Sequence, residues 1–275
     1  MDPIEAELKS NSKILMIVNS YHEAKIAVKY LNNLLSEKQA ACMIRATDED
    51  DLKSDDKVLR GEVGSFDKHI AKILIAPAQA IERGYNIVDE NGHSTFGSVF
   101  FLVRPMAVPD EISSKCAKLN GIIEKRFCSE KDTGAFKKAY ELRQYAAKQW
   151  KVMEEQSKKS LTFLNDTMKK DVTASLFILI LQIFGRLARI TDKNKPAPKV
   201  YFADGAFRTA PDHPDGYDCL NELRDYLEQM MSDETSREIA KTLYEPFYEA
   251  FKKGVNNNVY TDIPYGDDPE DEYIF

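Results

Sequence analysis

The sequence lacks a phosphate-binding loop of the form G-x-x-x-x-G-K-[ST], the turn that cradles the phosphates of a bound nucleotide. It also lacks a D-E-x-[DH] pattern after an apolar strand, because the acidic residues 48–51 follow Ala46-Thr47 in a predicted loop. ATP hydrolysis requires groups that hold the β- and γ-phosphates and Mg²⁺. These absences exclude a chain that hydrolyses ATP alone in that manner.

Cysteine is scarce, and its spacing excludes two further classes. The four cysteines form no C-x-x-C pair and have no histidine cluster near them: Cys42, Cys116, Cys128 and Cys219. Neither a disulfide framework nor a structural zinc site is therefore expected, and no metal ligand set is predicted. The default expectation is a reducing, cytoplasmic setting.

Long apolar runs are also missing. Residues 1–12 are polar and charged, so no signal peptide is expected. The run 176–184 is too short for a membrane span, and Gln182 and Arg186 interrupt its continuation. The histidines are scattered, and no Ser/His/Asp or Cys/His grouping is visible, so an enzyme with its own small-molecule site is the least favoured class.

Charge is distributed unevenly along the 275 residues, whose formal net charge is −7. Residues 110–170 contain 14 Lys/Arg against 9 Asp/Glu, whereas residues 210–275 contain 5 against 17. A basic middle can attract phosphate backbones, and an acidic tail repels them. The alternative is that both regions are simply solvated helix faces.

Apolar runs alternate with helical patterns, which predicts an α/β fold with a mainly parallel sheet flanked by helices. The expected strands are residues 14–18, 41–45, 72–76, 98–103 and 199–204. A helix is expected over residues 22–35. The stretch before the last strand is too long for a simple crossover, which predicts a helical insertion at residues 107–170 of a domain formed by residues 1–205. A helical extension (206–255) and an acidic tail (256–275) are expected to follow.

The most informative pattern is residues 182–189, which read Q-x-x-G-R-x-x-R and contain Gln182, Gly185, Arg186 and Arg189. Two arginines three residues apart share one face of a helix. Each guanidinium is a permanent, forked charge that suits phosphate oxygens, so the pair could reach a triphosphate on a facing surface. The alternative is an ordinary helix with a charged outer face.

Two other features lie at the ends of expected strands. Residues 73–86 read as a buried strand followed by a loop with Gly84 and Asn86, and ligands of open parallel sheets bind beyond the carboxyl ends of strands. Asn19 and Ser20 end the first strand, where amides and hydroxyls can hold a phosphate. The alternatives are a turn glycine in the first case and helix capping by Ser20 in the second.

In this order, the three features resemble motifs IV, V and VI of the second RecA-like domain of superfamily 2 helicases and translocases. Residues 16–20 look like motif IV, residues 75–86 are similar to motif V, and residues 182–189 match the motif VI framework. The resemblance covers roughly residues 13–204 without the insertion. That insertion resembles accessory helices of some bacterial helicases, including ones tied to phage defence.

The resemblance implies roles for individual residues. Arg186 and Arg189 would be arginine fingers that offset charge on the γ-phosphate, with Gln182 positioning them. The nucleotide would lie against Gly84, Asn86 and Gly185, and the nucleic-acid backbone against Asn19, Ser20 and Gln79. The chain departs from motif V, because Pro77 and Ala78 replace the usual threonine region and Asn86 replaces an aspartate.

The predicted function is the C-terminal motor half of a nucleic-acid-dependent ATPase. ATP and Mg²⁺ would be held mainly by a separate N-terminal RecA-like domain, in a longer protein or a split motor; a relic that has lost its motor is the third option. Cations of the insertion would line the path of the strand, with Tyr145 or Trp150 stacking on bases. The alternative is a non-catalytic adaptor that binds protein partners.

Overall fold

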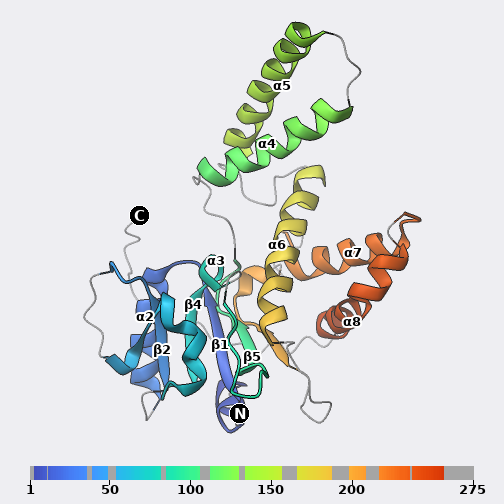
Figure 1. Cartoon of the computed structure of the whole chain (residues 1–275). Coiled ribbons are helices and arrows are strands. Elements are labelled where there is room, and N and C mark those ends of the chain that lie inside the picture. The colour runs from blue at the N-terminus through green and yellow to red at the C-terminus, as the bar shows by residue number, and fades with distance from the viewer. Residues whose placement is uncertain are drawn as a thin grey trace, which may run out of the picture. The chain divides into compact units, whose positions relative to one another are not determined.

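The structure is a computed structural model, and it describes residues 3–10, 12–35, 39–48, 54–81, 85–105, 112–129, 134–156, 166–187, 198–208, 217–235 and 237–256. The chain divides into two compact units, Met1–Cys219 and Leu220–Phe275. The first unit contains the sheet, and the second consists of helices (Figure 1).

The first unit is built on a six-stranded sheet with the order β3-β2-β4-β1-β5-β6, in which every strand pairing is parallel. Its strands are β1 (Lys13–Val18), β2 (Ala40–Ile44), β3 (Lys57–Leu59), β4 (Ile73–Pro77), β5 (Phe96–Phe101) and β6 (Lys199–Phe202). The predicted α/β class with helices flanking a parallel sheet is therefore confirmed, and the arrangement is consistent with a RecA-like domain.

The helices of the first unit are α1 (Pro3–Leu8), α2 (Tyr21–Leu34), α3 (Ala78–Ile81), α4 (Ile112–Ser129), α5 (Ala135–Gln156) and α6 (Asp166–Leu187). Three of them, α4 to α6, lie between β5 and β6 in the chain, which is the predicted helical insertion before the last strand. The helix α6 is continuous across residue 170, where the insertion was expected to end. The C-terminal helices are α7 (Cys219–Ser232) and α8 (Arg237–Asn256).

Both faces of the sheet are buried. One face forms a core with α2, in which Ala24 and Val28 of the helix meet alternate strand residues such as Met16. The other alternate strand residues, such as Leu15 and Phe101, are also fully buried. Strands covered on both faces are apolar at consecutive positions, which is why uninterrupted apolar runs predicted them correctly.

The segment after β2 differs from the prediction. Residues 48–56 were expected to form a loop; residues 49–53 lie outside the described part of the chain, and Ser54–Asp56 forms a 3-10 turn (η1) directly before the edge strand β3. A second 3-10 segment, η2 (Arg60–Lys68), follows β3. No periodic apolar pattern marks these elements, because β3 is only three residues long and only its central Val58 is buried.

A half-buried lysine holds η2 against the sheet. The ammonium group of Lys13, the first residue of β1, donates hydrogen bonds to the carbonyl oxygens of Phe66 (2.6 Å), His69 (2.5 Å) and Ala71 (3.1 Å). The same group lies 4.5 Å from the centre of the Phe66 ring. Burial lowers the pKa of Lys13, and three carbonyl acceptors compensate the desolvated charge. This long-range contact fixes η2, which begins at Arg60.

Candidate functional site

Arg186 joins α6 to the segment that follows α3. Its guanidinium Nη1 donates a hydrogen bond to the main-chain carbonyl of Tyr85, 101 residues earlier in the chain. Its own carbonyl accepts a hydrogen bond from the Ser94 hydroxyl at 2.9 Å, immediately before β5 begins. The Tyr85 contact is to a neutral carbonyl, so it orients the guanidinium without cancelling its charge.

Packing of α6 explains how Arg186 is held. Five of its apolar residues recur at helical spacing and are buried: Leu176, Phe177, Ile180, Ile183 and Leu187. In Figure 1 α6 runs alongside β5, and its last turn reaches the start of that strand. Because Leu187 is fully buried next to Arg186, the last turn cannot move without exposing apolar surface.

Tyr85 brings a second arginine into the site. Its hydroxyl accepts a hydrogen bond from Nε of Arg60 at 2.9 Å, while its carbonyl accepts the bond from Arg186. The bond to Tyr85 raises the pKa of Arg60 above its ordinary value. One tyrosine thus positions two permanently charged groups, one from η2 and one from α6.

Arg60 was not predicted as a site residue from the sequence. The only sequence feature that marks Arg60 is its position directly after Val58-Leu59, and the strand β3 that contains these two residues was not predicted.

The other residues of the predicted arginine motif lie close by or outside the described part of the chain. Gln182 is half-buried on α6, four residues before Arg186 and therefore on the same helix face. Gly185 is exposed, and no described atom lies within 4 Å of a Cβ built onto it. Arg189 and Gly84 lie outside the described residues, so their roles remain predictions.

Asn86 is exposed and lies one residue after Tyr85. The chain from there runs back to the amino ends of the central strands, because Thr95 N donates to Ile87 O (3.3 Å) and Lys13 N donates to Thr95 O (3.1 Å). This loop was predicted to lie beyond the carboxyl ends of the strands. Helix α3 lies there, but the described chain from Tyr85 onwards lies towards the opposite edge of the sheet.

Asn19 and Ser20 follow β1 at the carboxyl edge of the sheet. Ser20 is the N-cap of α2, where its side-chain oxygen accepts a hydrogen bond from Glu23 N at 3.1 Å. The Glu23 carboxylate in turn accepts one from Asn19 N at 2.8 Å. The capping alternative for Ser20 is thus confirmed. Asn19 is exposed, and its side-chain amide lies 3.4 Å from Arg104 O.

Gln79 and Arg45 lie along the same edge. Gln79 is the exposed second residue of α3, which begins where β4 ends. Arg45 is exposed directly after β2, and its guanidinium carbon lies 4.5 Å from the centre of the Tyr21 ring. Because the strands are parallel, their carboxyl ends bring these side chains to one edge. Arg45 was counted as the end of a strand in the sequence, so its exposure was missed.

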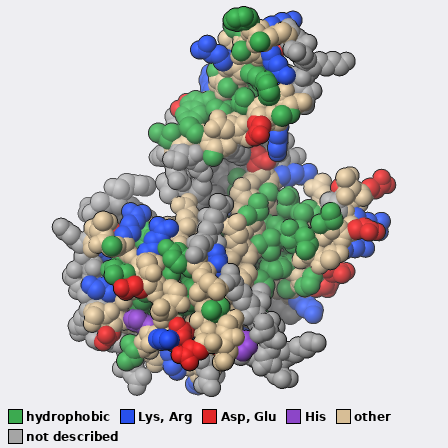
Figure 2. Space-filling model, in the orientation of Figure 1, with side chains coloured by type: hydrophobic (Ala, Val, Ile, Leu, Met, Phe, Trp, Pro, Cys, Tyr) green, Lys and Arg blue, Asp and Glu red, His purple; other side chains and the backbone are tan. Residues whose placement is uncertain are grey.

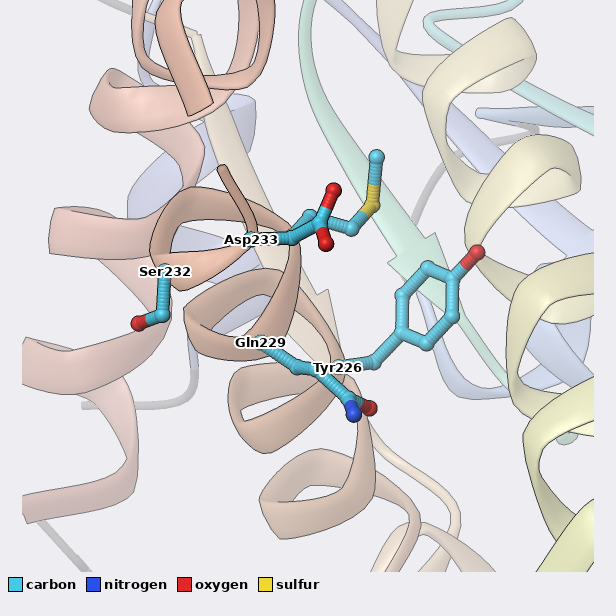
Figure 3. A pocket seen from close by; sticks show the side chains of 5 residues that line it. Tyr226, Gln229, Ser232 and Asp233 are labelled. Carbon is cyan, nitrogen blue, oxygen red and sulfur yellow. The ribbon is translucent and has the colours of Figure 1, made fainter. Parts of the chain in front are cut away.

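A shallow pocket of about 500 Å³ lies elsewhere, in the second unit, on α7 and the turn after it. Its lining is Tyr226, Gln229, Met230, Ser232 and Asp233. In Figure 3 Tyr226 and Ser232 extend to opposite sides of the helix, and the Ser232 hydroxyl donates to Glu228 O of its own helix at 2.8 Å. Polar groups that do not converge give no basis for catalysis.

The described residues offer neither a metal site nor a membrane-spanning helix. No three His, Cys, Asp or Glu side chains gather there in a way that could hold a metal ion. No described helix combines the length and apolar character needed to cross a membrane.

Comparison with known proteins adds no further assignment, since no family model matches the chain and no curated protein matches its sequence.

Proposed function

We propose that this chain is the C-terminal motor half of a nucleic-acid-dependent ATPase of the helicase and translocase type. The observation that supports the proposal is the contact between Arg186 and Tyr85. It joins Arg186 of the arginine motif to Tyr85 of the segment 75–86 that resembles motif V, and the two residues are far apart in the sequence. Both residues belong to a domain built on a parallel sheet flanked by helices, which is the fold that the resemblance to superfamily 2 helicases implies.

In the proposed mechanism a separate RecA-like domain binds ATP, and this domain closes onto it. Closure brings Arg186 and Arg189 to the γ-phosphate, where guanidinium groups offset the charge that develops during hydrolysis. Gln182 positions the arginines, and Asn86, Gly84 and Gly185 lie against the nucleotide. Arg60 holds the Tyr85 side chain and so steadies the carbonyl that orients Arg186.

Magnesium is assigned to the partner domain. Mg²⁺ prefers carboxylate oxygens and the phosphates of its substrate, and the described part of this chain brings no group of such side chains together. The residues near Arg186 instead supply fixed positive charge. We therefore expect this half to stabilise the transition state rather than to hold the metal.

The nucleic-acid strand is proposed to follow the carboxyl edge of the sheet. Asn19 and Gln79 are exposed there and can donate amide hydrogen bonds to phosphate oxygens. Arg45, stacked on Tyr21, adds a planar cation at the same edge. Ser20 offers its hydroxyl only in addition to its capping bond. Release after hydrolysis would shift this edge along the strand.

The experiment that tests the proposal compares arginine variants in the assembled protein. The chain is purified with its partner domain or subunit, and ATP turnover is measured with and without single-stranded nucleic acid. Arg186→Lys keeps the charge but loses the planar fork, so turnover should fall by roughly 10³-fold or more. Ser94→Ala removes the hydrogen bond to the Arg186 carbonyl and leaves the guanidinium intact, so it controls for helix docking.

Unchanged turnover in Arg186→Lys and Arg186→Ala would overturn the proposal. The isolated chain is expected to show no ATP turnover, since it has no phosphate-binding loop. Nucleic-acid-stimulated turnover by the isolated chain would contradict that expectation.

A second candidate function is a non-catalytic adaptor. One observation favours it: α2 carries an exposed apolar ridge of Ile26, Tyr30 and Leu34, which are 56%, 63% and 63% exposed. Residues at this spacing lie on one helix face, and contiguous exposed apolar surface marks protein contacts. If the chain is an adaptor, its assembly with the partner should show no ATP turnover. Tyr30→Ala should then weaken partner binding, and Arg186→Ala should leave partner binding unchanged.

A further inference from the structure

The helices α4 and α5 form a hairpin whose inner surface is occupied by their own side chains. They pack against each other, and Met153 of α5 is buried. Arg126 of α4 lies 4.0 Å from the centre of the Tyr145 ring. Trp150 is half-buried. The two aromatic residues that the sequence offered as base-stacking platforms are therefore less accessible than the outer side of α5.

The opposite side of α5 is exposed and carries aromatic and basic residues together. Phe136 is 96% exposed and Tyr140 is 65% exposed. Four exposed cations share this side with them: Lys137, Arg143, Lys148 and Lys151. These positions follow the helical repeat, so they form one face that extends over about 22 Å at a rise of about 1.5 Å per residue. We call these six residues the α5 face.

Charge on the hairpin has the opposite sign to the charge of the whole chain. Residues 112–129 and 134–156 together contain nine Lys/Arg and four Asp/Glu, a net charge of +5, whereas the chain has −7. Figure 2 shows hydrophobic side chains and Lys/Arg side by side over these helices. A local positive field on an acidic chain selects a negatively charged partner.

We propose that the α5 face binds single-stranded nucleic acid. Its cations contact successive phosphates, and Phe136 and Tyr140 stack on bases, the combination by which proteins bind single strands without reading their sequence. This goes beyond the proposed function, because it assigns a second strand-binding surface that needs neither ATP nor Arg186. The partner is a polyanion with flat apolar groups along its length.

The placement of the side chains favours nucleic acid over the other anionic surfaces. A helix that lies on an anionic membrane separates an apolar face from a basic one. On α5 the exposed aromatic side chains share one face with the cations, and the remaining apolar side is packed on α4. An acidic protein would satisfy the cations but offers no regular series of planar groups for Phe136 and Tyr140.

The test uses the full 275-residue chain and fluorescently labelled oligonucleotides of about 20 nucleotides, oligo-dT and oligo-U. Fluorescence anisotropy gives Kd at several salt concentrations. The wild-type chain should bind, and log K should fall linearly with log salt. Anionic phospholipid vesicles and poly-glutamate serve as competitors; neither should displace the oligonucleotide at equal charge concentration.

Two variants address the two kinds of contact. Phe136→Ala/Tyr140→Ala should weaken binding by about tenfold or more, because the bases lose the aromatic rings on which they stack. Lys137→Ala/Lys148→Ala should reduce the slope of log K against log salt by about 1.4, that is, about 0.7 for each phosphate that is no longer neutralised. The matched control is Lys241→Ala/Lys253→Ala, which removes two exposed lysines from α8 and should leave the slope unchanged.

Each remaining outcome counts against the inference. Wild-type affinity in both α5 variants would place the strand elsewhere, and displacement by vesicles or poly-glutamate would assign the face to a different partner. No binding by the wild-type chain would also overturn it. The proposed ATPase stands or falls separately, because its readout is turnover in Arg186 variants, whereas this experiment contains no ATP.

Discussion

Two helices of equal length, α5 and α6, differ in how far their side chains are buried. Each has 22 residues, and they are neighbours in the sequence. On α6 one row of apolar residues, from Leu176 to Leu187, recurs every three to four positions and is buried, and Ile183 is completely buried. On α5 Met153 is buried, whereas Phe136 and the cations of the α5 face are exposed.

The difference in burial determines how firmly the cations of each helix are held in position. Burial of α6 fixes the backbone of Arg186 against Ser94, so its guanidinium has a defined partner in Tyr85. Charge-dependent chemistry needs such fixed positions. The cations of α5 lie on a solvent-facing side and can adjust to a flexible polymer. Fixed charge suits a bound triphosphate, and adjustable charge suits a strand.

The largest expected effect is on stability, and it separates the two helices. Ile183→Ala on α6 should lower the free energy of unfolding by about 3 kcal/mol, because it removes fully buried apolar volume. Phe136→Ala on α5 should change it by less than about 0.5 kcal/mol, since that side chain is 96% exposed. Urea denaturation measures both. Similar destabilisation in the two variants would show that α5 is covered in solution.

A buried carboxylate in the first unit and an exposed cation on α5 should differ in the same way in their effect on stability at low pH. The carboxylate of Glu7 on α1 is buried and accepts hydrogen bonds from Lys199 Nζ (2.6 Å) and Tyr201 OH (3.0 Å). Burial alone would raise the pKa of Glu7, but the bonds from Lys199 and Tyr201 outweigh it and lower the pKa.

Because the folded-state pKa of Glu7 lies below the unfolded value, its contribution is present above that value and is lost as the pH falls through the folded pKa. Glu7→Gln should lower the free energy of unfolding by about 1.5 kcal/mol at neutral pH. On acidification the variant should lose less stability than the wild type. Urea midpoints at about pH 6 and about pH 3.5 test this. Lys148→Ala on α5 is the control, and an equal acid-induced destabilisation in Glu7→Gln would contradict the assignment.

A smaller effect concerns two helical glycines. A Cβ added to Gly185 of α6 or to Gly121 of α4 has no described atom within 4 Å. Both Gly→Ala changes should therefore stabilise the chain by about 0.5–1 kcal/mol through helix propensity. Only Gly185→Ala should lower ATP turnover of the assembly, if the nucleotide approaches α6 there. Equal turnover in the two variants would remove Gly185 from the site.

The smallest effect compares two arginine–tyrosine contacts. Tyr85→Phe removes the hydroxyl that accepts from Arg60 and keeps the carbonyl that accepts from Arg186. This change should lower the free energy of unfolding by about 0.5 kcal/mol, the usual contribution of a solvent-accessible hydrogen bond. Tyr145→Phe keeps the ring beneath Arg126 and should be neutral within about 0.3 kcal/mol. Thermal denaturation compares them; a cost at Tyr145 would show that its hydroxyl matters.

Much of the fold was predictable, because strands buried on both faces must be apolar throughout. The runs that became β1, β2, β4 and β5 were placed within two residues of their observed ends. The short strand β3 and the segment η2 were not predictable in this way. The strand β3 is held by its pairing with β2, and η2 is held by Lys13, whose three carbonyl partners are more than 50 residues away in the chain.

The sequence alone determined the α/β class, the long helical insertion and the arginine motif, since periodicity and residue chemistry are local properties. Only the tertiary structure decided that Tyr85 would hold both Arg60 and Arg186, and that Phe136 rather than Trp150 would face solvent. The reason is physical: which side of a helix is exposed, and which carbonyl a guanidinium meets, depends on packing between segments that are distant in the chain.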